Sequence, residues 1–443
     1  MSNGFEIKSV SAIEIFDSRG NPTVEATVTL NSGIMASCIA PSGASTGSME
    51  ACELRDGGER MRGKGVLKAV ENVNTKINAA LQGKNCLKQR DIDDILINLD
   101  GTKNKTKLGA NAILPVSIAT AKAASMHNNS PMYKYIGGVN SNTLPAPMIN
   151  VINGGAHADN KLDIQEFMIM PISGDSFSSA FNMATDVFFA LKSILKQRGL
   201  STNVGDEGGF APDIGSPELA LDLIMMAIEK GGYKPAKDFV LALDVAANEL
   251  TVNDRNDYYE FVGLGEKFDS SKLCEYYRSL ILNYPIFSIE DPVAENDKEG
   301  FKEITEVIGN VVQLVGDDYF VTNPALISQG IKDGVGNAVL IKPNQIGTLT
   351  ETLDAIAVAK RGGYQTIISH RSGESEDVSI SQISVGANVS QIKTGSTSRT
   401  DRVAKYNELI RIENMLGDDA NYAGRLIGDV FKKFRLESGG ISW

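Results

Sequence analysis

The sequence lacks an apolar run long enough to cross a membrane. Its richest helical stretch, "LALDLIMMAIEKGG" (219–232), is interrupted by Asp222 and Glu229, whereas a transmembrane helix needs about 20 predominantly apolar residues. The N-terminus also lacks the apolar core of a secretory signal, because charged residues recur every few positions along residues 1–20. The sequence therefore predicts neither a membrane-spanning protein nor a secreted one.

Cysteine is scarce, and no two cysteines form a Cys-x-x-Cys pair. The four are Cys38, Cys52, Cys86 and Cys274. A sparse set without such pairs is typical of free thiols in a reducing compartment. Together with the missing signal, it predicts a cytoplasmic protein.

An excess of positive charge is absent as well. The formal net charge is −12, and no block of Lys and Arg offsets it, so nucleic acid and anionic membrane surfaces would be repelled. We therefore expect neither a nucleic-acid partner nor a membrane partner. A small anionic substrate would need positive charge supplied by its own binding site.

The length predicts two domains. The chain has 443 residues, which exceeds the roughly 250–300 at which a single hydrophobic core stops growing. We expect an N-terminal α+β capping domain over residues 1–135, a linker over 136–142 and a C-terminal catalytic barrel over 143–443.

The first domain has strand patterns followed by helical ones. Apolar runs at 7–16, 23–30 and 34–40 are separated by turn residues and predict a three-stranded antiparallel sheet. Helical periodicity is clearest at 66–81 and 108–126. The fold class is therefore α+β for this part and α/β for the chain as a whole.

The second domain has a different rhythm. Two strand-like runs (147–154 and 164–172) precede two helical patterns, and from residue 239 six apolar runs alternate with amphipathic helices. Strands alternating with helices at this period imply parallel βα units. We expect a TIM-like barrel with an irregular ββαα(βα)6 order, and an added excursion near 251–263.

Each of the last six predicted strands ends in a charged or ionisable residue. Strand-end solubility would favour a mixture with Ser, Asn, Thr and Gly instead. In barrels of this kind the carboxyl ends of the strands carry the chemistry. The strand ends are Asp244, Glu290, Asp317, Lys342, His370 with Arg371, and Lys393.

Asp244, Glu290 and Asp317 come from adjacent strands and would repel one another if left alone. Oxygen ligands without sulfur favour Mg²⁺ over Zn²⁺ or copper. Three independent salt bridges are the alternative, although the surrounding runs are apolar. The cations from the next strands, which include Lys342 and Arg371, would form a positive half-site for a phosphate or carboxylate.

Three loop features are weaker when taken alone. "GDEGGF" (205–210) surrounds Glu207 with glycines that allow a sharp turn, yet glycine-rich acidic loops are usually solvated turns. "SGASTGSME" (42–50) is equally compatible with a mobile lid and a flexible connector. His157 follows a glycine pair, and a lone histidine is more often structural than catalytic.

At this point the sequence resembles the enolase family along nearly the whole chain. The resemblance lies in an ordered series of long motifs, each rarely met elsewhere. They are "DSRGNPTVE" (17–25), "SGASTG" (42–47), "LGANAIL" (108–114), "HADNKLDIQEFMI" (157–169), "GDEGGFAP" (205–212), "SIEDP" (288–292), "NQIGTLTET" (344–352), "SHRSGE" (369–374) and "QIKTG" (391–395).

The resemblance implies a glycolytic and gluconeogenic lyase that reversibly dehydrates 2-phospho-D-glycerate to phosphoenolpyruvate. It implies that Lys342 acts as the base and Glu207 as the acid. The implied Mg²⁺ ligands are Asp244, Glu290 and Asp317, with Ser42 completing a second Mg²⁺ that binds with substrate. The implied substrate-binding residues are His157, Gln165, Glu166, His370, Arg371, Ser372 and Lys393. Family members are typically homodimers or higher assemblies of dimers.

The implied chemistry sets two requirements on pKa values. Lys342 must be neutral to accept a proton, and we expect nearby Mg²⁺ and Lys393 to lower its pKa. Glu207 must hold a proton, and we expect Glu166 to raise its pKa. Pro343 should push Lys342 towards an extended backbone conformation.

Two other interpretations of the sequence stay open. The chain could be another Mg²⁺-dependent acid dehydratase or racemase of the same superfamily, or a non-catalytic binding protein on this fold. "GDEGGF", "SGASTG" and "SHRSG" argue against the first, because they supply an acid, a lid and a phosphate anchor. The complete set of charged strand ends argues against the second.

Overall fold

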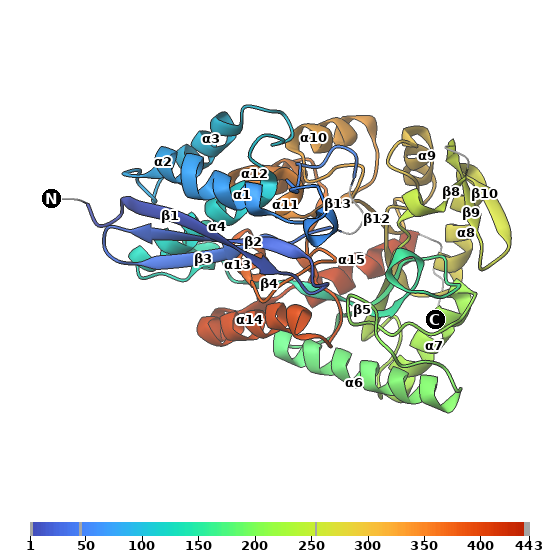
Figure 1. Ribbon diagram of the computed structural model, residues 1–443. Helices are drawn as coiled ribbons and strands as arrows, with labels where there is room; N and C mark the ends of the chain where they lie inside the picture. The colour runs from blue at the N-terminus through green and yellow to red at the C-terminus, as the bar shows by residue number, and fades with distance from the viewer. Residues whose placement is uncertain (1–2, 44–46, 253–254, 438–443) are drawn as a thin grey trace.

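The computed structural model describes residues 3–43, 47–252 and 255–437 (Figure 1). Its N-terminal part is the predicted antiparallel sheet, β1 (Ile7–Phe16), β2 (Pro22–Leu30) and β3 (Met35–Ile39), in the order β1-β2-β3. Gly33 turns the chain between β2 and β3 with φ +88°, a conformation that glycine adopts without steric cost.

Helices follow this sheet along the chain. They are η1 (Arg60–Gly63), α1 (Leu67–Asn72), η2 (Val73–Ile77), α2 (Asn78–Leu81), α3 (Gln89–Asp100), α4 (Ala110–His127), α5 (Met132–Gly137) and η3 (Gly138–Asn140). Of these, α1, η2, α2 and α4 pack against the sheet. The helix predicted over 66–81 is one continuous run with a π-helical turn, η2, in its middle. The long helix α4 packs against β2 and β3 and is buried along almost its whole length.

Eight strands of the described chain close into a barrel. Their order around it is β11-β12-β13-β14-β15-β5-β6-β7. Their bounds are β5 (Ala146–Asn153), β6 (Glu166–Pro171), β7 (Phe239–Asp244), β11 (Ile286–Glu290), β12 (Gln313–Gly316), β13 (Ala338–Ile341), β14 (Gln365–Ser369) and β15 (Gln391–Lys393). The chain order ββαα(βα)6 confirms the predicted irregular start.

One strand runs against the others. β6 pairs antiparallel with both β5 and β7, whereas the remaining neighbouring pairs are parallel. The first residues of β6 therefore lie at the rim where the other strands end. This reversal brings residues from the beginning of a strand to the edge that carries the chemistry in such barrels.

Helices cover the outside of the barrel. They are α6 (Phe177–Gln197), α7 (Pro217–Lys230), α8 (Ser270–Asn283), α9 (Lys298–Ile308), α10 (Pro324–Asp333), α11 (Pro343–Ile346), α12 (Leu349–Arg361), α13 (Ser379–Gly386), α14 (Thr400–Leu416) and α15 (Gly424–Glu437). Side-chain caps fix where several begin: Ser176 accepts from the Ser179 amide at α6, and Thr348 accepts from the Glu351 amide at α12.

Smaller elements complete the structure. The predicted excursion after β7 is a sheet of β8 (Thr251–Val252), β9 (Arg255–Phe261) and β10 (Glu266–Asp269). β4 (Thr143–Leu144) pairs with β16 (Asn421–Tyr422), and short helices η4 (Gly155–His157), η5 (Ala247–Leu250) and η6 (Gly417–Asp419) lie in loops. Within the described ranges, no helix is both long and apolar enough to span a bilayer.

The N-terminal sheet, blue in Figure 1, approaches the barrel near the carboxyl end of β14. Ser42 and Gly373 exchange two backbone hydrogen bonds of 2.8 and 2.9 Å, and the Ser18 amide donates to the Glu374 carbonyl at 2.7 Å. These contacts place the segment after β3 beside the barrel rim. The site described next lies where the two parts meet.

Candidate active site

A cavity of about 450 Å³, its mouth included, opens at the carboxyl rim of the barrel. All the predicted site residues except Glu290 and Ser42 line it. The lining is His157, Gln165, Glu166, Glu207, Asp244, Ala246, Asp291, Asp317, Asp318, Lys342, Ser369, His370, Arg371, Ser372 and Lys393. Almost every one of these side chains is polar or charged, as a highly charged small substrate would require.

The reversed strand explains how Gln165 and Glu166 reach this cavity. Glu166 is the first residue of β6 and pairs with Asp244, the last residue of β7. The Gln165 amide nitrogen donates to the Asp244 carboxylate at 3.3 Å, while its buried Oε1 has no hydrogen-bond partner. A buried acceptor left unpaired in a cavity fits a ligand or cation, because such a group is costly to leave unsatisfied.

The predicted metal ligands lie at the ends of three adjacent strands. Glu290 lies behind the cavity, where the Lys393 ammonium donates to both its oxygens at 2.9 and 2.8 Å and to Asp244 at 2.7 Å. Burial, with the charge of Asp244 next, raises the pKa of Glu290 to about 8. This crowding of buried carboxylate oxygens fits a hard divalent cation such as Mg²⁺.

Two acidic residues here were not predicted. Oxygens of Asp291, Asp317 and Asp318 lie within 4.8 Å of one another, close enough to hold one ion. The Asp291 carboxylate also accepts the backbone amides of Asp317, at 2.8 Å, and Asp318, at 3.1 Å. In the sequence, Asp291 is the second acidic residue of "SIEDP" and Asp318 is the second Asp of "GDD". Each directly follows a residue that was predicted as a metal ligand.

Lys342 is held at the end of β13 in the way that Pro343 predicts. Its φ and ψ are −116° and 105°, an extended conformation, and Pro343 is the first residue of α11. The expected lowering of its pKa depends on Mg²⁺ and stays a prediction. Burial does disfavour the ammonium, but an ion pair with the Asp317 carboxylate more than offsets it and raises the pKa of Lys342.

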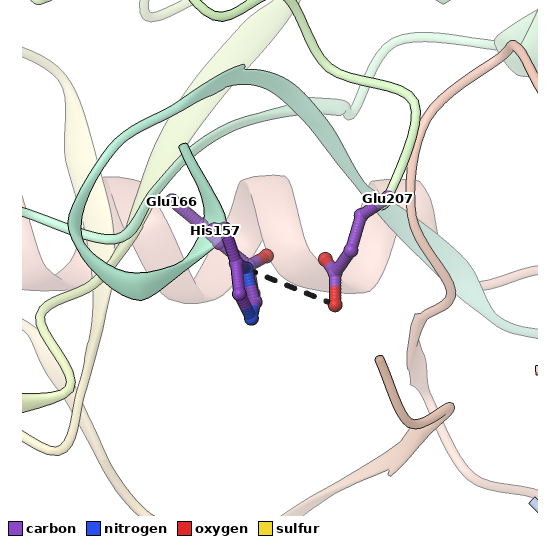
Figure 2. Close-up of side chains that lie close together, drawn as sticks. All are labelled: His157, Glu166 and Glu207. Atoms are coloured by element: carbon purple, nitrogen blue, oxygen red, sulfur yellow. Dashed lines mark ion pairs between the residues drawn. The ribbon is translucent and has the colours of Figure 1, made fainter. Parts of the chain in front are cut away.

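Across the cavity, Glu166 and Glu207 both lie close to His157, and the three groups form one cluster (Figure 2). His157 Nδ1 is 3.6 Å from Glu166 Oε1 and 4.0 Å from Glu207 Oε1. His370 Nε2 is 3.3 Å from the same Glu207 oxygen, and Asn150 donates to the other at 3.2 Å. These contacts place Glu207 in a buried network of donors.

The expected raised pKa of Glu207 is also wrong for this structure. Burial acts to raise it, but His370 and His157 outweigh burial and lower the pKa of Glu207 well below its usual value. Burial, with the charge of Glu207 next, instead raises the pKa of Glu166 far above its usual value. Two close carboxylates of this kind share one proton.

The glycines of "GDEGGF" act as predicted, because they allow Glu207 to point inward. Gly208 has φ +87°, and a Cβ there would lie 2.6 Å from the Ser398 carbonyl oxygen. The Ser396 amide donates to the Glu207 carbonyl at 2.9 Å, which fixes the backbone of the loop. Glu207 is consequently 3% exposed.

The cationic half of the site holds an ion pair that was not predicted. Arg371 donates to both carboxylate oxygens of Glu50 at 2.8 and 3.3 Å, and the two side chains are 3% and 7% exposed. Glu50 also accepts from the Gly47 amide at 3.0 Å and from Gln345 at 3.2 Å. Glu50 is the last residue of the loop "SGASTGSME". Nothing in the sequence indicated its contact with the arginine of "SHRSG".

The structure does not bring Ser42 to the predicted metal ligands Asp244, Glu290 and Asp317. Its hydroxyl donates to Asp17 at 2.7 Å and receives a hydrogen bond from Arg19 at 3.2 Å. Residues 44–46 of the same loop lie outside the described residues. The predicted role of Ser42 at a second Mg²⁺ and the predicted closure of this loop stay predictions.

Two family models cover nearly the whole chain. The model described as "Enolase, N-terminal domain" matches residues 7–136, and the model described as "Enolase, C-terminal TIM barrel domain" matches residues 141–430. The matches follow chain order and agree with the sheet, the barrel and the acidic, lysine-bearing rim. This family consists of lyases of the enolase type, and the chain belongs to the enolase family.

Proposed function

We propose that the protein catalyses the reversible, Mg²⁺-dependent dehydration of 2-phospho-D-glycerate to phosphoenolpyruvate. One observation carries the proposal. Lys342 follows β13, and Glu166 begins β6, which lies four strands away in either direction around the barrel. A buried amine and a proton-sharing carboxyl pair therefore face each other across one cavity. A dehydration that removes a proton on one side of the substrate and expels a hydroxyl on the other needs a base and an acid on opposite sides of the cavity.

The carboxylates that would hold Mg²⁺ are Asp244, Glu290 and Asp317. When bound, the ion supplies positive charge where negative charge develops on the substrate carboxylate; a lysine base with such ions is the arrangement generally described for enolase-type sites. We propose a second Mg²⁺, bound with substrate.

Lys342 is the proposed base at C2. Its pKa in this structure is raised by Asp317, and burial, Arg371 and Lys393 all act in the opposite direction. Any competitor for the Asp317 oxygens would therefore lower the pKa of Lys342 and free the amine to accept a proton. Arg371 offers a planar fork that matches the substrate phosphate.

Glu207 is the proposed acid at the C3 hydroxyl. Glu166 and Glu207 hold one proton between them across His157, so the pair supplies the proton that hydroxide needs to leave. His370, Gln165, Ser372 and Lys393 would bind and orient the substrate. We further propose a cytoplasmic protein with a glycolytic and gluconeogenic role. We also propose that it forms a homodimer or an assembly of dimers, and mass measurement of the purified protein tests this assembly.

The deciding experiment follows the absorbance of phosphoenolpyruvate after 2-phosphoglycerate is added to the purified protein. Formation should require Mg²⁺ and should cease with a chelator. Glycerate without the phosphate is the matched control substrate and should give no product. Conversion of a non-phosphorylated acid in place of 2-phosphoglycerate would indicate another superfamily reaction, and no conversion of any acid would refute the proposal.

A further inference from the structure

Arg402, near the start of α14, lies directly beneath the acid half of the site. It is fully buried, at 0% exposure, and was not singled out from the sequence. Burying a guanidinium is costly unless its donors are satisfied. Its hydrogen-bond partners are the carbonyls of Asp206, Arg371 and Ser372 at 3.2, 2.6 and 2.6 Å and His370 Nδ1 at 2.5 Å. The Asp401 carboxylate lies 2.8 Å from Nε as an ion pair, although Nε itself makes no hydrogen bond.

The contact between Arg402 and His370 determines where the imidazole proton lies. Arginine has five N–H donors, no acceptor and a charge that it keeps at any ordinary pH. His370 Nδ1 must therefore be the acceptor and carry no proton. Burial, with Arg402 adding to it and Glu207 opposing it, lowers the pKa of His370 to about 4, so its ring is neutral at neutral pH.

A neutral imidazole with an unprotonated Nδ1 carries its proton on Nε2. His370 Nε2 is the atom that lies 3.3 Å from Glu207 Oε1. In this tautomer the ring donates to the carboxylate, whereas in the other tautomer two lone pairs would face each other. Glu374 also acts on the ring, and like Glu207 it favours protonation.

We propose that Arg402 is a positioning residue that fixes His370 in the Nε2–H tautomer and so aims a permanent hydrogen-bond donor at Glu207. The inference rests on the proposed function, in which Glu207 gives a proton to the leaving hydroxyl. The donor stabilises the carboxylate that remains after this transfer. It therefore affects the dehydration step and not the removal of the C2 proton.

The surrounding backbone is shaped to admit Arg402. Gly395 follows β15 with φ +78°, and a Cβ there would lie 2.7 Å from Arg402 Cδ and 2.8 Å from the Glu207 carbonyl oxygen. The Tyr406 hydroxyl donates to the Gly395 carbonyl at 2.7 Å and holds this segment in place. The arginine stem thus passes within contact distance of the loop that carries the acid.

The tautomer is tested directly by nitrogen NMR of protein labelled with ¹⁵N in histidine. The sequence contains three histidines, and H127Q and H157N each remove one set of signals for assignment. In the wild type, His370 Nδ1 should resonate as an unprotonated nitrogen and Nε2 as a protonated one. R402M should shift the ring towards the Nδ1–H form, and R402K, which still donates, should retain the wild-type form.

Kinetics separate positioning from general damage. R402M should reduce kcat for dehydration by about 100-fold, the lower bound for a general acid or base, while exchange of the C2 proton with solvent stays within about threefold of wild type. R411M, which removes an exposed arginine from the same helix, is the control and should change neither. Equal loss of both steps in R402M would show a merely structural role and overturn the proposal.

A wild-type spectrum with a proton on His370 Nδ1 would overturn the proposal whether or not R402M folds. The spectrum is recorded on the resting enzyme without substrate, so it does not depend on the reaction. A wild-type protein with the expected tautomer but no conversion of 2-phosphoglycerate would refute the proposed function and leave the tautomer assignment standing. The two failures are therefore distinguishable.

Discussion

At the scale of single residues, Lys342 shows why a lysine lies at the edge of an apolar strand. Its side chain is 15% exposed and faces a carboxylate, two other cations and the cavity. If it is the base, K342A should abolish exchange of the C2 proton of 2-phosphoglycerate with solvent, because no other amine faces the substrate from β13. Exchange is measured by NMR of substrate in deuterated buffer.

The matched control for this variant is K105A. Lys105 is likewise buried and paired with a carboxylate, Glu351 at 2.7 Å, but it does not line the cavity. K105A should lower the melting temperature and leave exchange intact. Exchange at the wild-type rate in K342A would remove Lys342 from the role of base.

A variant of Glu207 should impair dehydration and spare exchange of the C2 proton. E207Q keeps the shape of the side chain but cannot give up a proton, so dehydration should fall by about 10²–10⁴-fold. Exchange of the C2 proton should stay measurable, because Lys342 lies on the other side of the cavity. Dehydration by E207Q at the wild-type rate would show that another group is the acid, and E351Q serves as a control carboxylate outside the cavity.

At the scale of elements, the contacts between the segment after β3 and the barrel include a buried ion pair. Glu50 occupies the Arg371 fork that the substrate phosphate is proposed to take. E50Q should lower the melting temperature, because a buried guanidinium loses its charged partner. Inorganic phosphate should then raise the melting temperature of E50Q more than that of the wild type, since the anion would replace the missing charge.

Thermal unfolding with and without phosphate measures this effect. E295Q is the control, because Glu295 also accepts from this segment, from the Ser48 amide at 3.1 Å, but does not line the cavity. E295Q should respond to phosphate as the wild type does. An E50Q protein that gains no more from phosphate than the wild type would show that Glu50 and the anion do not compete for Arg371.

The elements also differ in how well the sequence alone predicts them. Apolar runs that end in charged residues predicted the barrel and six of the fifteen residues that line the cavity, because strand period and strand ends are local features. The direction of β6 is not local, so the resemblance alone indicated Glu166. Glu50 and Arg402 gain their roles from contacts with Arg371 and His370, more than 300 and about 30 residues away, which no spacing reveals.

The pKa shift predicted for Glu207 is wrong, and the shift predicted for Lys342, which depends on Mg²⁺, stays a prediction; one physical reason applies to both. The direction of such a shift depends on which of several buried charges lies nearest, and burial and opposite charge act against each other. Lys342 has Asp317 as its nearest carboxylate, and Glu207 has two histidines beside it. Composition of the rim identified the groups that titrate together, but only their distances decide which one holds the proton.

At the scale of the whole molecule, the capping part and the barrel are joined by charged contacts of two kinds. Lys122 of α4 donates to Asp377, just before α13, at 2.7 Å, and the side chains are 22% and 12% exposed. Arg90 of α3 pairs with Asp354 of α12 at 2.9 Å, but there the exposures are 63% and 45%. Exposed pairs contribute at most about 1 kcal/mol, whereas breaking a buried pair costs more.

The half-buried Lys122–Asp377 pair should make stability depend on pH below about 4. Burial alone would raise the pKa of Asp377, but Lys122 outweighs it and lowers the pKa to about 2 from an ordinary 3.8. A carboxylate with a lowered folded-state pKa stabilises the protein above the unfolded-state value, and this contribution is lost as pH falls through the folded-state value. The shift corresponds to about 2 kcal/mol at neutral pH.

D377N should therefore lower the free energy of unfolding by about 2 kcal/mol at pH 7, and the difference from wild type should shrink as pH falls from 4 towards 2. Denaturant unfolding at a series of pH values measures both quantities. D354N removes the exposed pair that also joins the two parts, and it should cost less than about 1 kcal/mol. If D377N and D354N cost the same at pH 7, or if the D377N difference does not narrow in acid, the Lys122–Asp377 pair is not what couples the sheet domain to the barrel.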